Sequence, residues 1–481
     1  MDVESEQRPL KLYFIPYLAA GHMIPLCDIA ILFASRGQHV TIITTPSNTT
    51  TIDSSLPNLH LHTVPFPSRQ VGLPDGIESF SSSADLQTTF KVHQGIKLLR
   101  EPIQLFMEHH PADCVVADYC FPWIDDLTTE LHIPRLSFNP SPLFALCAMR
   151  AKRGSSSFLI SGLPHGDIAL NASPPEALTA CVEPLLRKEL KSHGVLINSF
   201  VELDGHEYVK HYERTTGGHK AWLLGPASLV RGTAKEKAER GHEKSVVSTD
   251  ELLSWLSTKK PSSVLYVCFG SMCSFSNEQL HEMACGIEAS SVEFVWVVPA
   301  EKRGKEEEEE EEKEKWLPEG FEEKGMILRG WAPQLLILGH PSVGAFLTHC
   351  GSNSALEAVS AGVPIITWPV LGDQFYTEKL MTEVRGVGVE VGAEEWSMGG
   401  GRRERERVVI SRDKIEKAVR RLMGGGEEAE QIRRRVHELG NLANAAVQPG
   451  GSSYQNLTAL IAHLKTLRDS NSVSSSMPPL H

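Results

Sequence analysis

The sequence predicts an α/β protein made of two doubly wound, Rossmann-like domains that face each other across a cleft. Short β-rich runs alternate with helical patterns along most of the 481 residues, and this alternation is typical of parallel sheets with crossover helices. It is interrupted between Thr233 and Val246, where the chain is charged and nearly free of apolar residues. A chain of this length commonly forms two or three domains, so we expect one domain to end near this stretch.

Each half of the chain supplies its own series of elements. The first series predicts helices at Ile24–Arg36 and Phe121–Leu131 and strands at Leu12–Ile15, Val40–Thr44, Cys114–Ala117, Arg135–Phe138 and Gly194–Asn198. The second series predicts helices at Asn277–Ala289 and Ser354–Ala361 and strands at Ser263–Phe269, Phe294–Val298, Met326–Arg329, Gly344–Thr348 and Ile365–Trp368.

From these series we assign residues 1–243 to the first domain, 244–260 to a linker and 261–452 to the second domain. A helix near Tyr454–Leu467, within 453–468, follows the second domain, and we expect residues 469–481 to form a disordered tail. The acidic segment Glu301–Lys315 and the Gly/Arg-rich segment Ser397–Arg407 are predicted to be exposed loops.

Charge and composition exclude some classes of function. The chain carries 47 basic and 60 acidic residues, a net charge of −13, and 41% of its residues are hydrophobic. Nonspecific nucleic-acid binding needs a basic surface, so the charge argues against it. Part of the negative charge is local, in the unbroken glutamate run Glu306–Glu312, which we interpret as a solvated loop.

The cysteines and the N-terminus predict a cytoplasmic protein. Nine cysteines are scattered without a CxxC pair, which favours reduced core residues over disulfides or a zinc site. The first apolar run, Leu12 to Ala20, contains Pro16 and is too short to span a membrane. No secretory signal is visible. We therefore expect no stable membrane insertion.

The stretch Trp331–Gln374 combines features that suit a phosphorylated ligand. A buried strand, Gly344–Thr348, runs into His349–Ser354 (HCGSNS) and then into a helix. Backbone N–H groups at the start of such a helix, together with the helix dipole, attract anions. Asn353 and Ser354 can add side-chain donors, although they would also serve as an ordinary helix N-cap.

Other side chains of this stretch suit the remaining parts of a nucleotide sugar. The indole of Trp331 can stack on a base, unless it is a core residue, and the Gln334 amide can meet the edge of that base. Glu357 lies about one turn into the helix, where its carboxylate can accept hydrogen bonds from ribose; a solvated helix face is the alternative. Asp373 and Gln374 can hold adjacent sugar hydroxyls.

This stretch closely resembles the signature box of plant family 1 UDP-glycosyltransferases at nearly every position. The resemblance implies the GT-B fold, a C-terminal helix (453–468) that packs back on the first domain, and a UDP-sugar as co-substrate. It also implies a donor site made of Ser271, Trp331, Ala332, Gln334, His349, Gly351, Ser352, Asn353, Ser354, Glu357, Asp373 and Gln374.

Two positions of the box bear on the sugar. In the family, Gln at the last position, here Gln374, usually goes with glucose, and His goes with galactose. Ser352 departs from the family pattern, because most members have Trp there, and the change removes a large side chain beside the sugar and phosphate. Glucose is the expectation, with UDP-xylose, UDP-arabinose and UDP-rhamnose as alternatives.

The predicted catalytic pair lies in the first domain. The loop Gly21–Pro25 (GHMIP) follows the first predicted strand, and ligands of open α/β sheets bind beyond the carboxyl ends of strands. The GHxxP spacing matches the family's catalytic histidine, which implies that His22 is the general base. Asp118 ends another predicted strand and can orient the imidazole; a helix N-cap is the alternative for this residue.

The resemblance further implies a single displacement that inverts the anomeric carbon through an oxocarbenium-like transition state. No DxD-type metal motif is evident, so we expect no required metal and no cofactor apart from the UDP-sugar. By the same resemblance, the protein is expected to be a monomer.

The first domain should bind the acceptor. Its opening, residues 8–46, looks like the subgroup acting on triterpenoids (saponin aglycones) and flavonoids, and we favour a triterpenoid or saponin. Asn139, Pro140 and Ser141 are expected to approach the C6 side of the sugar. Apolar candidates for the pocket, each of which can equally be core, are Phe80, Phe90, Phe121, Leu143, Phe144, Met149 and Leu185.

Rival interpretations fit the sequence less well. A nicotinamide-dependent oxidoreductase predicts G-x-G-x-x-G after the first strand, where this chain has YLAAGHMIP, and the run Gly399–Gly401 lacks a strand-turn-helix context. A catalytically silent UDP-sugar-binding protein would not need the base, yet His22 and Asp118 are both present. A transferase with another activated donor is opposed by the completeness of the box.

Overall fold

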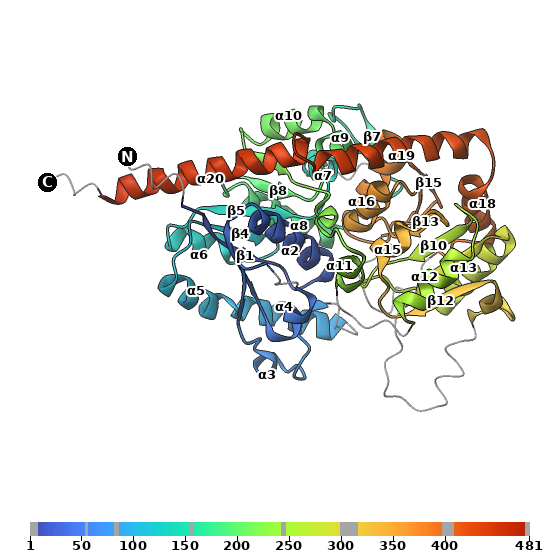
Figure 1. The fold of residues 1–481 in the computed structure, drawn as a ribbon, viewed down its shortest axis with the longest axis horizontal. Helices are drawn as coiled ribbons and strands as arrows, with labels where there is room; N and C mark the ends of the chain where they lie inside the picture. Colours follow the sequence, from blue (N-terminus) through green and yellow to red (C-terminus); the bar gives the residue numbers. More distant parts are fainter. Residues whose placement is uncertain are drawn as a thin grey trace. The chain divides into compact units, whose positions relative to one another are not determined.

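The computed structural model describes residues 8–52, 56–80, 86–152, 158–241, 247–298, 316–396 and 408–476. Its contacts divide the chain into two compact units (Figure 1). Unit 1 comprises Met1–Leu143, Ala180–Val230 and Ala445–His481, and unit 2 comprises Phe144–Thr179 and Arg231–Asn444. The acidic segment Glu301–Lys315, with Glu306–Glu312, and the segment Ser397–Arg407, with Gly399–Gly401, lie outside the described residues.

Unit 1 is built on a seven-stranded parallel sheet with the order β3-β2-β1-β4-β5-β8-β9. Its strands are β1 (Lys11–Ile15), β2 (His39–Thr44), β3 (Leu59–Thr63), β4 (Cys114–Asp118), β5 (Arg135–Asn139), β8 (Val195–Ile197) and β9 (Ala221–Leu223).

Helices cover both faces of this sheet, because alternate side chains of a strand point to opposite sides. Leu12 and Phe14 of β1 join a core cluster with α2, whereas Tyr13 and Ile15 join a second cluster with α4, α5 and α6. The helical segments around this sheet are α2 (Ala20–Ser35), η1 (Pro46–Thr51), α3 (Ser68–Val71), α4 (Leu86–Leu98), α5 (Arg100–His109), α6 (Ile124–Glu130), α8 (Glu176–Glu189), α9 (Val201–Asp204), α10 (His206–Thr215) and η3 (Ala227–Val230).

The C-terminal helix α20 (Ser452–Ser476) also belongs to unit 1. Leu457, Leu460 and Leu464 recur at helical spacing, are buried, and share the core cluster of α2. The Arg36 guanidinium lies over the Tyr454 ring, 3.5 Å from its centroid. The helix therefore extends into the stretch that we predicted as a tail, and residues 477–481 lie outside the described part.

Unit 2 is built on a six-stranded parallel sheet with the order β12-β11-β10-β13-β14-β15. Its strands are β10 (Val264–Cys268), β11 (Glu293–Val298), β12 (Gly325–Arg329), β13 (Val343–Thr348), β14 (Ile365–Thr367) and β15 (Gly388–Glu390). The predicted doubly wound α/β architecture is thus confirmed within each unit.

The helical segments of unit 2 are α11 (Ala234–Glu239), α12 (Thr249–Ser257), α13 (Asn277–Ser290), η5 (Phe321–Lys324), α15 (Gln334–Leu338), α16 (Ser352–Ala361), α17 (Gln374–Lys379), the π-helical η6 (Leu380–Val384), α18 (Arg412–Met423) and α19 (Glu427–Ala446). Residues 144–179 add most of α7 (Leu143–Ala151) and the hairpin of β6 (Leu159–Ile160) and β7 (Ile168–Ala169). Asn171 ties residues 144–179 to the rest of unit 2, because its amide donates to Glu378 and Glu390 and accepts from Lys379.

Two local features differ from the sequence-based expectation. Helix α2 begins at Ala20, whereas we expected it at Ile24, so His22 lies in its first turn and not in a preceding loop. Pro25 usually marks a helix boundary, but here it lies inside the helix. The predicted linker 244–260 contains helix α12. The domain limits that we assigned stay a prediction.

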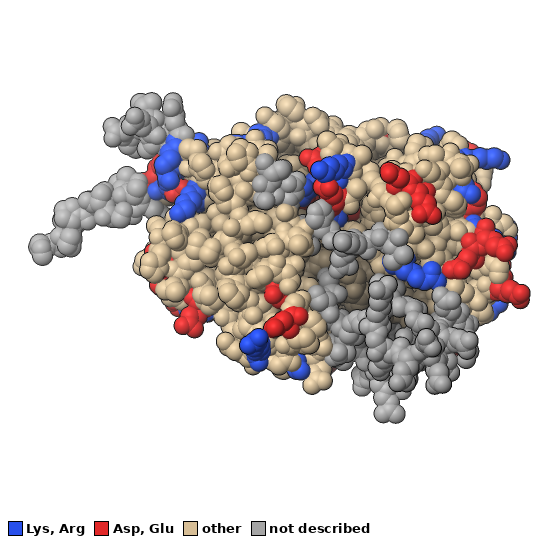
Figure 2. Space-filling view, turned by 60° about the horizontal axis from the view of Figure 1, so that its bottom comes forward, with Lys and Arg blue, Asp and Glu red and all other residues tan. Residues whose placement is uncertain are grey.

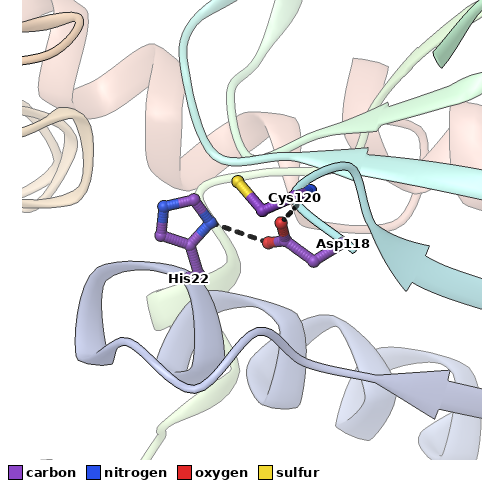
Figure 3. A group of neighbouring side chains, drawn as sticks. All are labelled: His22, Asp118 and Cys120. Carbon is purple, nitrogen blue, oxygen red and sulfur yellow. Dashed lines mark hydrogen bonds and ion pairs between the residues drawn. The ribbon is translucent and has the colours of Figure 1, made fainter. Parts of the chain in front are cut away.

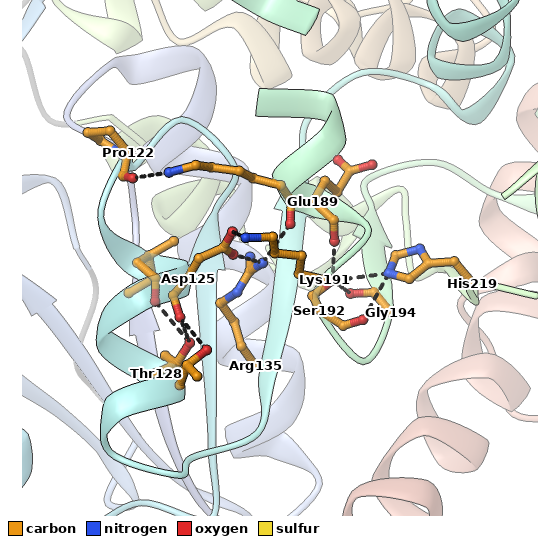
Figure 4. Close-up of polar contacts among 12 residues, drawn as sticks. Pro122, Asp125, Thr128, Arg135, Glu189, Lys191, Ser192, Gly194 and His219 are labelled. Atoms are coloured by element: carbon orange, nitrogen blue, oxygen red, sulfur yellow. Dashed lines mark hydrogen bonds and ion pairs between the residues drawn. The ribbon is translucent and has the colours of Figure 1, made fainter. Parts of the chain in front are cut away.

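A buried polar network joins α6, β5 and the end of α8 (Figure 4). Arg135 donates to the carboxylate of Asp125 and to the carbonyl of Lys188. Nearby, Asn139 donates to Glu189 over 3.0 Å and accepts from the backbone N–H of Ser141. Each charged group has a partner, as burial requires.

The distribution of charged side chains and the character of the helices agree with the charge and hydrophobic content of the sequence. On the face drawn in Figure 2, basic side chains occur in small groups among acidic and uncharged ones. Within the described ranges, none of the helices combines the length and apolar character needed to cross a bilayer.

Replacement Leu460→Ala should lower the thermal unfolding midpoint by several degrees, because burying less side chain and leaving a cavity costs about 2–5 kcal/mol. Thr466→Ala, an exposed change on the same helix, serves as the control. Circular dichroism melts compare the two, and equal midpoints would contradict the docking of α20 on the unit 1 core.

Candidate active site

The predicted catalytic pair is assembled by two adjacent parallel strands. β1 pairs with β4 through Ile15 and Ala117, so the residues that follow these two strands emerge at the same sheet edge. Asp118 ends β4 and is fully buried, while His22 lies in the first turn of α2 with 24% of its side chain exposed. His22 Nδ1 lies 2.8 Å from Asp118 Oδ2 (Figure 3).

This contact determines what the imidazole can do. With the ring hydrogen on Nδ1, His22 donates to the carboxylate, and Nε2 keeps its lone pair. In Figure 3 the second ring nitrogen points away from Asp118. The other carboxylate oxygen accepts from the backbone N–H of Cys120 over 2.9 Å. Asp118 is therefore fixed on both oxygens, and the pair has the geometry of a general base and its orienting acid.

Aromatic rings line the region beside His22. Tyr17 stacks on Phe80, with ring centroids 5.4 Å apart, and meets Phe121 edge-on at the same distance. Its ring centroid is 5.7 Å from that of His22. Burial raises the pKa of Tyr17 well above its usual value, so the phenol stays neutral. We did not predict Tyr17 from sequence, although its place just after the first strand was the available signal.

The remaining acceptor candidates differ in exposure. Phe121, Leu143 and Phe144 are buried, Met149 and Leu185 are half-buried, and Phe90 is 62% exposed. Asn139 is fully buried, and its amide group is engaged at both ends by Glu189 and Ser141. Its side chain is therefore held in place by unit 1, and the expected approach of Asn139, Pro140 and Ser141 to the sugar stays a prediction.

Cys120 adds a third potential ligand atom beside the pair. The ligand atoms of His22, Asp118 and Cys120 all lie within 4.8 Å of one another (Figure 3). Imidazole, carboxylate and thiolate are all ligands that Zn²⁺ accepts, so this group can hold a metal ion. The expectation that catalysis needs no metal stays a prediction.

The predicted anion-binding part of the stretch Trp331–Gln374 begins with a tight turn between β13 and α16. Cys350 has a positive φ of 60°, which is uncommon for a residue other than glycine. Gly351 is the N-cap of α16 and, because it has no side chain, forms no side-chain cap. Ser352, Asn353 and Ser354 form the first turn, where backbone N–H groups and the helix dipole favour an anion.

His349 is enclosed at this turn by two glycines. A Cβ atom would lie 2.8 Å from its ring at Gly270 and 2.5 Å from it at Gly351. Burial lowers the pKa of His349 to about 4, so the ring is neutral near pH 7. The neutral ring has one N–H, which has the Cys268 backbone as a partner in this state, and the ring brings no positive charge to a diphosphate. Ser271, which follows Gly270, is exposed.

Further along α16, the predicted ribose and uracil residues contact one another. Gln334 Nε2 donates to Glu357 Oε2 over 2.7 Å and to Ser354 Oγ over 3.2 Å, and its Oε1 accepts from Tyr266. The Gln334 amide is thus engaged within the protein in this state. Ala332 is buried and Trp331 is half-buried.

The predicted sugar residues are tied to the start of α16. Ser352 Oγ donates to Asp373 Oδ2 and lies 3.4 Å from Thr377 Oγ1. Gln374 Oε1 accepts from the backbone N–H groups of Val370 and Leu371, which leaves its NH₂ group to donate. The small Ser352 side chain therefore orients one of the two residues that we predicted to hold the sugar.

Comparisons with known proteins identify the family of the chain. A family model for UDP-glucoronosyl and UDP-glucosyl transferase matches residues 249–411. UDP-glucosyl transferase 73CC6 of Saponaria officinalis is 44% identical, and the match covers 96% of this chain and 98% of that protein. UDP-glucose flavonoid 3-O-glucosyltransferase 7 of Fragaria ananassa is also 44% identical, over 97% and 98% of the two chains.

The chain belongs to the UDP-glycosyltransferase family. Among solved structures, UGT73P12 of Glycyrrhiza uralensis, complexed with glycyrrhetinic acid 3-O-monoglucuronide, superimposes with a TM-score of 0.87 at 37% identity, over 97% of this chain and 98% of that one. The protein is therefore a UDP-glycosyltransferase with the GT-B fold, as the sequence resemblance implied. The oxidoreductase interpretation is excluded.

The neutral state of His349 has a consequence for binding of UDP-glucose, whose diphosphate does not titrate near neutrality. Because the lowered pKa of about 4 keeps the ring uncharged, affinity should not rise through His349 as pH falls from about 8 to about 5. Calorimetry at several pH values, with His349→Asn in parallel, measures this. A rise in affinity near pH 6.5 that disappears in His349→Asn would contradict it.

Proposed function

We propose that this UDP-glycosyltransferase is an inverting O-glucosyltransferase that acts on a hydroxyl or carboxyl of an apolar plant secondary metabolite, with a triterpenoid or saponin as the favoured acceptor. The observation that carries the catalytic part is the 2.8 Å contact between His22 Nδ1 and the buried Asp118 carboxylate. It gives the chain a base whose second ring nitrogen, Nε2, faces away from its orienting acid (Figure 3).

The reaction is a single displacement. His22 Nε2 takes the proton of the acceptor hydroxyl, and the resulting oxygen attacks the anomeric carbon. The bond between that carbon and the UDP oxygen breaks, so that UDP leaves with the electron pair. Asp118 stabilises the imidazolium that forms, as the carboxylate of a hydrolase triad does. Attack opposite UDP converts an α-linked D-hexose into a β-glycoside.

The donor residues act mainly through electrostatics. The start of α16, with Ser352, Asn353 and Ser354, donates hydrogen bonds to the diphosphate, whose negative charge grows as UDP leaves. The neutral His349 adds a hydrogen bond when its one N–H turns from the Cys268 backbone to the diphosphate. Ser271 adds a donor. Glu357 accepts from the ribose hydroxyls, and Trp331 with Ala332 receives the uracil.

Asp373 and Gln374 hold the sugar hydroxyls in this proposal. The Gln374 NH₂ group remains available as a donor because its carbonyl oxygen is used within the turn. Glucose is favoured by this glutamine and by the relatives named as glucosyltransferases. UDP-xylose, UDP-arabinose and UDP-rhamnose are the alternatives.

The acceptor class follows from two kinds of support. Tyr17 lies beside His22 and packs on Phe80 and on the buried Phe121, and an apolar, aromatic surrounding suits a flat or polycyclic apolar ligand. The neighbour UGT73P12 was solved with glycyrrhetinic acid 3-O-monoglucuronide, which favours a triterpenoid. A relative in Fragaria ananassa named for flavonoids makes a flavonoid or isoflavonoid the second candidate.

Location and assembly complete the proposal. All nine cysteines are free thiols, as is usual in reducing compartments, and we assign the enzyme to the cytoplasm. We propose that it works as a monomer and without a metal ion. A catalytically silent UDP-sugar-binding protein is the non-enzymatic alternative, which the assay below decides.

The test is a product assay by mass spectrometry that crosses UDP-glucose, UDP-galactose, UDP-glucuronate, UDP-xylose, UDP-arabinose and UDP-rhamnose with triterpenoid and flavonoid acceptors. A triterpenoid that gains one hexose with UDP-glucose supports the proposal. A product formed only with flavonoids, or only with another donor, would replace the acceptor or the sugar. UDP binding without any product would favour a silent binder.

His22→Ala should lower kcat by at least about 100-fold, because general base catalysis typically contributes about 10²–10⁴-fold. UDP affinity should stay nearly constant, since the donor box lies elsewhere in the chain. Steady-state kinetics and UDP calorimetry measure the two effects. Loss of UDP binding in this variant would mean that His22 has a structural role.

Ser352→Trp should change the ratio of kcat/KM between UDP-glucose and UDP-xylose, because it adds bulk and removes the hydrogen bond to Asp373. Ser352→Ala removes the hydrogen bond alone and separates the two causes. Competition assays with both donors give the ratio. An unaltered donor profile in both variants would show that residue 352 does not influence the sugar.

A further inference from the structure

The charged stretch that we took as the transition between domains contains a short helix held at its start. Thr233 accepts from the backbone N–H of Glu236, whose side chain accepts from the Thr233 backbone N–H over 2.7 Å. This reciprocal capping box fixes α11. The helix packs against α15, which begins with Gln334, and the chain then continues through Arg240 and Gly241.

Arg240 reaches the carboxylate that we assign to the ribose. Its Nη1 donates to Glu357 Oε1 over 2.6 Å, and the side chains are 9% and 4% exposed. Gln334 donates to the other oxygen, Oε2. A carboxylate oxygen can accept two hydrogen bonds. Each oxygen of Glu357 therefore retains capacity for a ribose hydroxyl while Arg240 and Gln334 stay in place.

Gly241 touches the ring that we assign to the uracil. Its φ is +91°, and a Cβ atom there would lie 2.1 Å from Trp331 Cζ2. Both the backbone conformation and the contact with the indole thus require glycine at this position. The turn of Arg240 and Gly241 thus contacts two residues of the predicted UDP-sugar site. Arg240 forms an ion pair with Glu357, and the backbone of Gly241 contacts Trp331.

Electrostatics gives the ion pair a role in donor binding. A buried carboxylate without a counter-charge is strongly unfavourable. A bound diphosphate at the start of α16, one helical turn from Glu357, would add repulsion between negative charges. Among the residues that the structure describes, Arg240 is the cation paired with Glu357, so it offsets both effects.

We propose that Arg240 is a positioning residue of the uridine subsite, which neutralises Glu357 and orients its two oxygens toward the ribose, while Gly241 braces the Trp331 indole. This inference rests on the proposed assignment of Glu357 to the ribose. It adds to the donor site a segment that precedes the signature box by about ninety residues in sequence.

The first test measures UDP affinity by calorimetry and donor KM and kcat by steady-state kinetics for Arg240→Ala and Arg240→Lys. We expect Arg240→Ala to weaken UDP binding and to raise the donor KM, each on the order of tenfold, because Glu357 loses its charge-assisted contact with Arg240. The value of kcat at saturating donor and the acceptor KM should change little. Arg240→Lys keeps the charge and should restore part of the affinity.

Matched controls lie on the same segment. Lys235→Ala removes a positive charge from the exposed side of α11, where the side chain is 81% exposed, and should leave UDP affinity unchanged. Gly241→Ala should weaken UDP binding by displacing Trp331. Gly232→Ala, where a Cβ would meet nothing closer than 3.9 Å, should not.

Three outcomes overturn the inference. Tighter UDP binding in Arg240→Ala would mean that Arg240 competes with the ribose. Unchanged UDP affinity with a lower melting temperature would make the ion pair purely structural. Equal affinity in Arg240→Lys and Arg240→Ala would remove the role of charge.

Glu357→Gln separates this inference from the proposed function. If Glu357→Gln leaves UDP affinity unchanged, the ribose assignment itself is wrong. If Glu357→Gln weakens UDP binding and Arg240→Ala does not, only the inference about Arg240 is wrong.

Discussion

The hydrogen bond between His22 and the fully buried Asp118 carboxylate is the contact on which the proposed chemistry depends. Parallel pairing of β1 with β4 brings the ends of two sequence-distant strands to one sheet edge. There Asp118 ends β4, and the chain after β1 enters α2 with His22 in its first turn. The sheet thus sets the position of the acid, and the acid sets the tautomer of the base.

The same construction recurs in unit 2 for a different purpose. β10 pairs with β13 through Cys268 and Thr348, so the turns after both strands meet. Gly270 follows one strand, and His349 follows the other and is enclosed against it. A ring enclosed in this way is kept neutral by burial, so the negative charge of a leaving diphosphate falls mainly to the N–H groups and dipole at the start of α16.

Much of this was predictable from the sequence because strand ends and glycine-rich turns have local signals. The predicted strands at the centres of both sheets, the turn at His349–Ser354 and the pairing of His22 with Asp118 all correspond to the structure. The first turn of α2 was not predicted, because Pro25 follows it and proline usually marks a helix boundary. The hydrogen bond from Asn139 to Glu189 was not predicted, because Glu189 lies far along the chain. Arg240 went unnoticed since the capping box of α11 was read only as a charged stretch.

The most direct measurement of the central claim is the turnover of Asp118→Asn at saturating UDP-sugar, together with its UDP affinity. The account predicts a fall in kcat of about 10²–10⁴-fold with UDP affinity unchanged, because the amide cannot hold His22 in the required tautomer or stabilise the imidazolium. A variant that turns over at close to the wild-type rate would contradict the assignment of His22 and Asp118 as base and orienting acid.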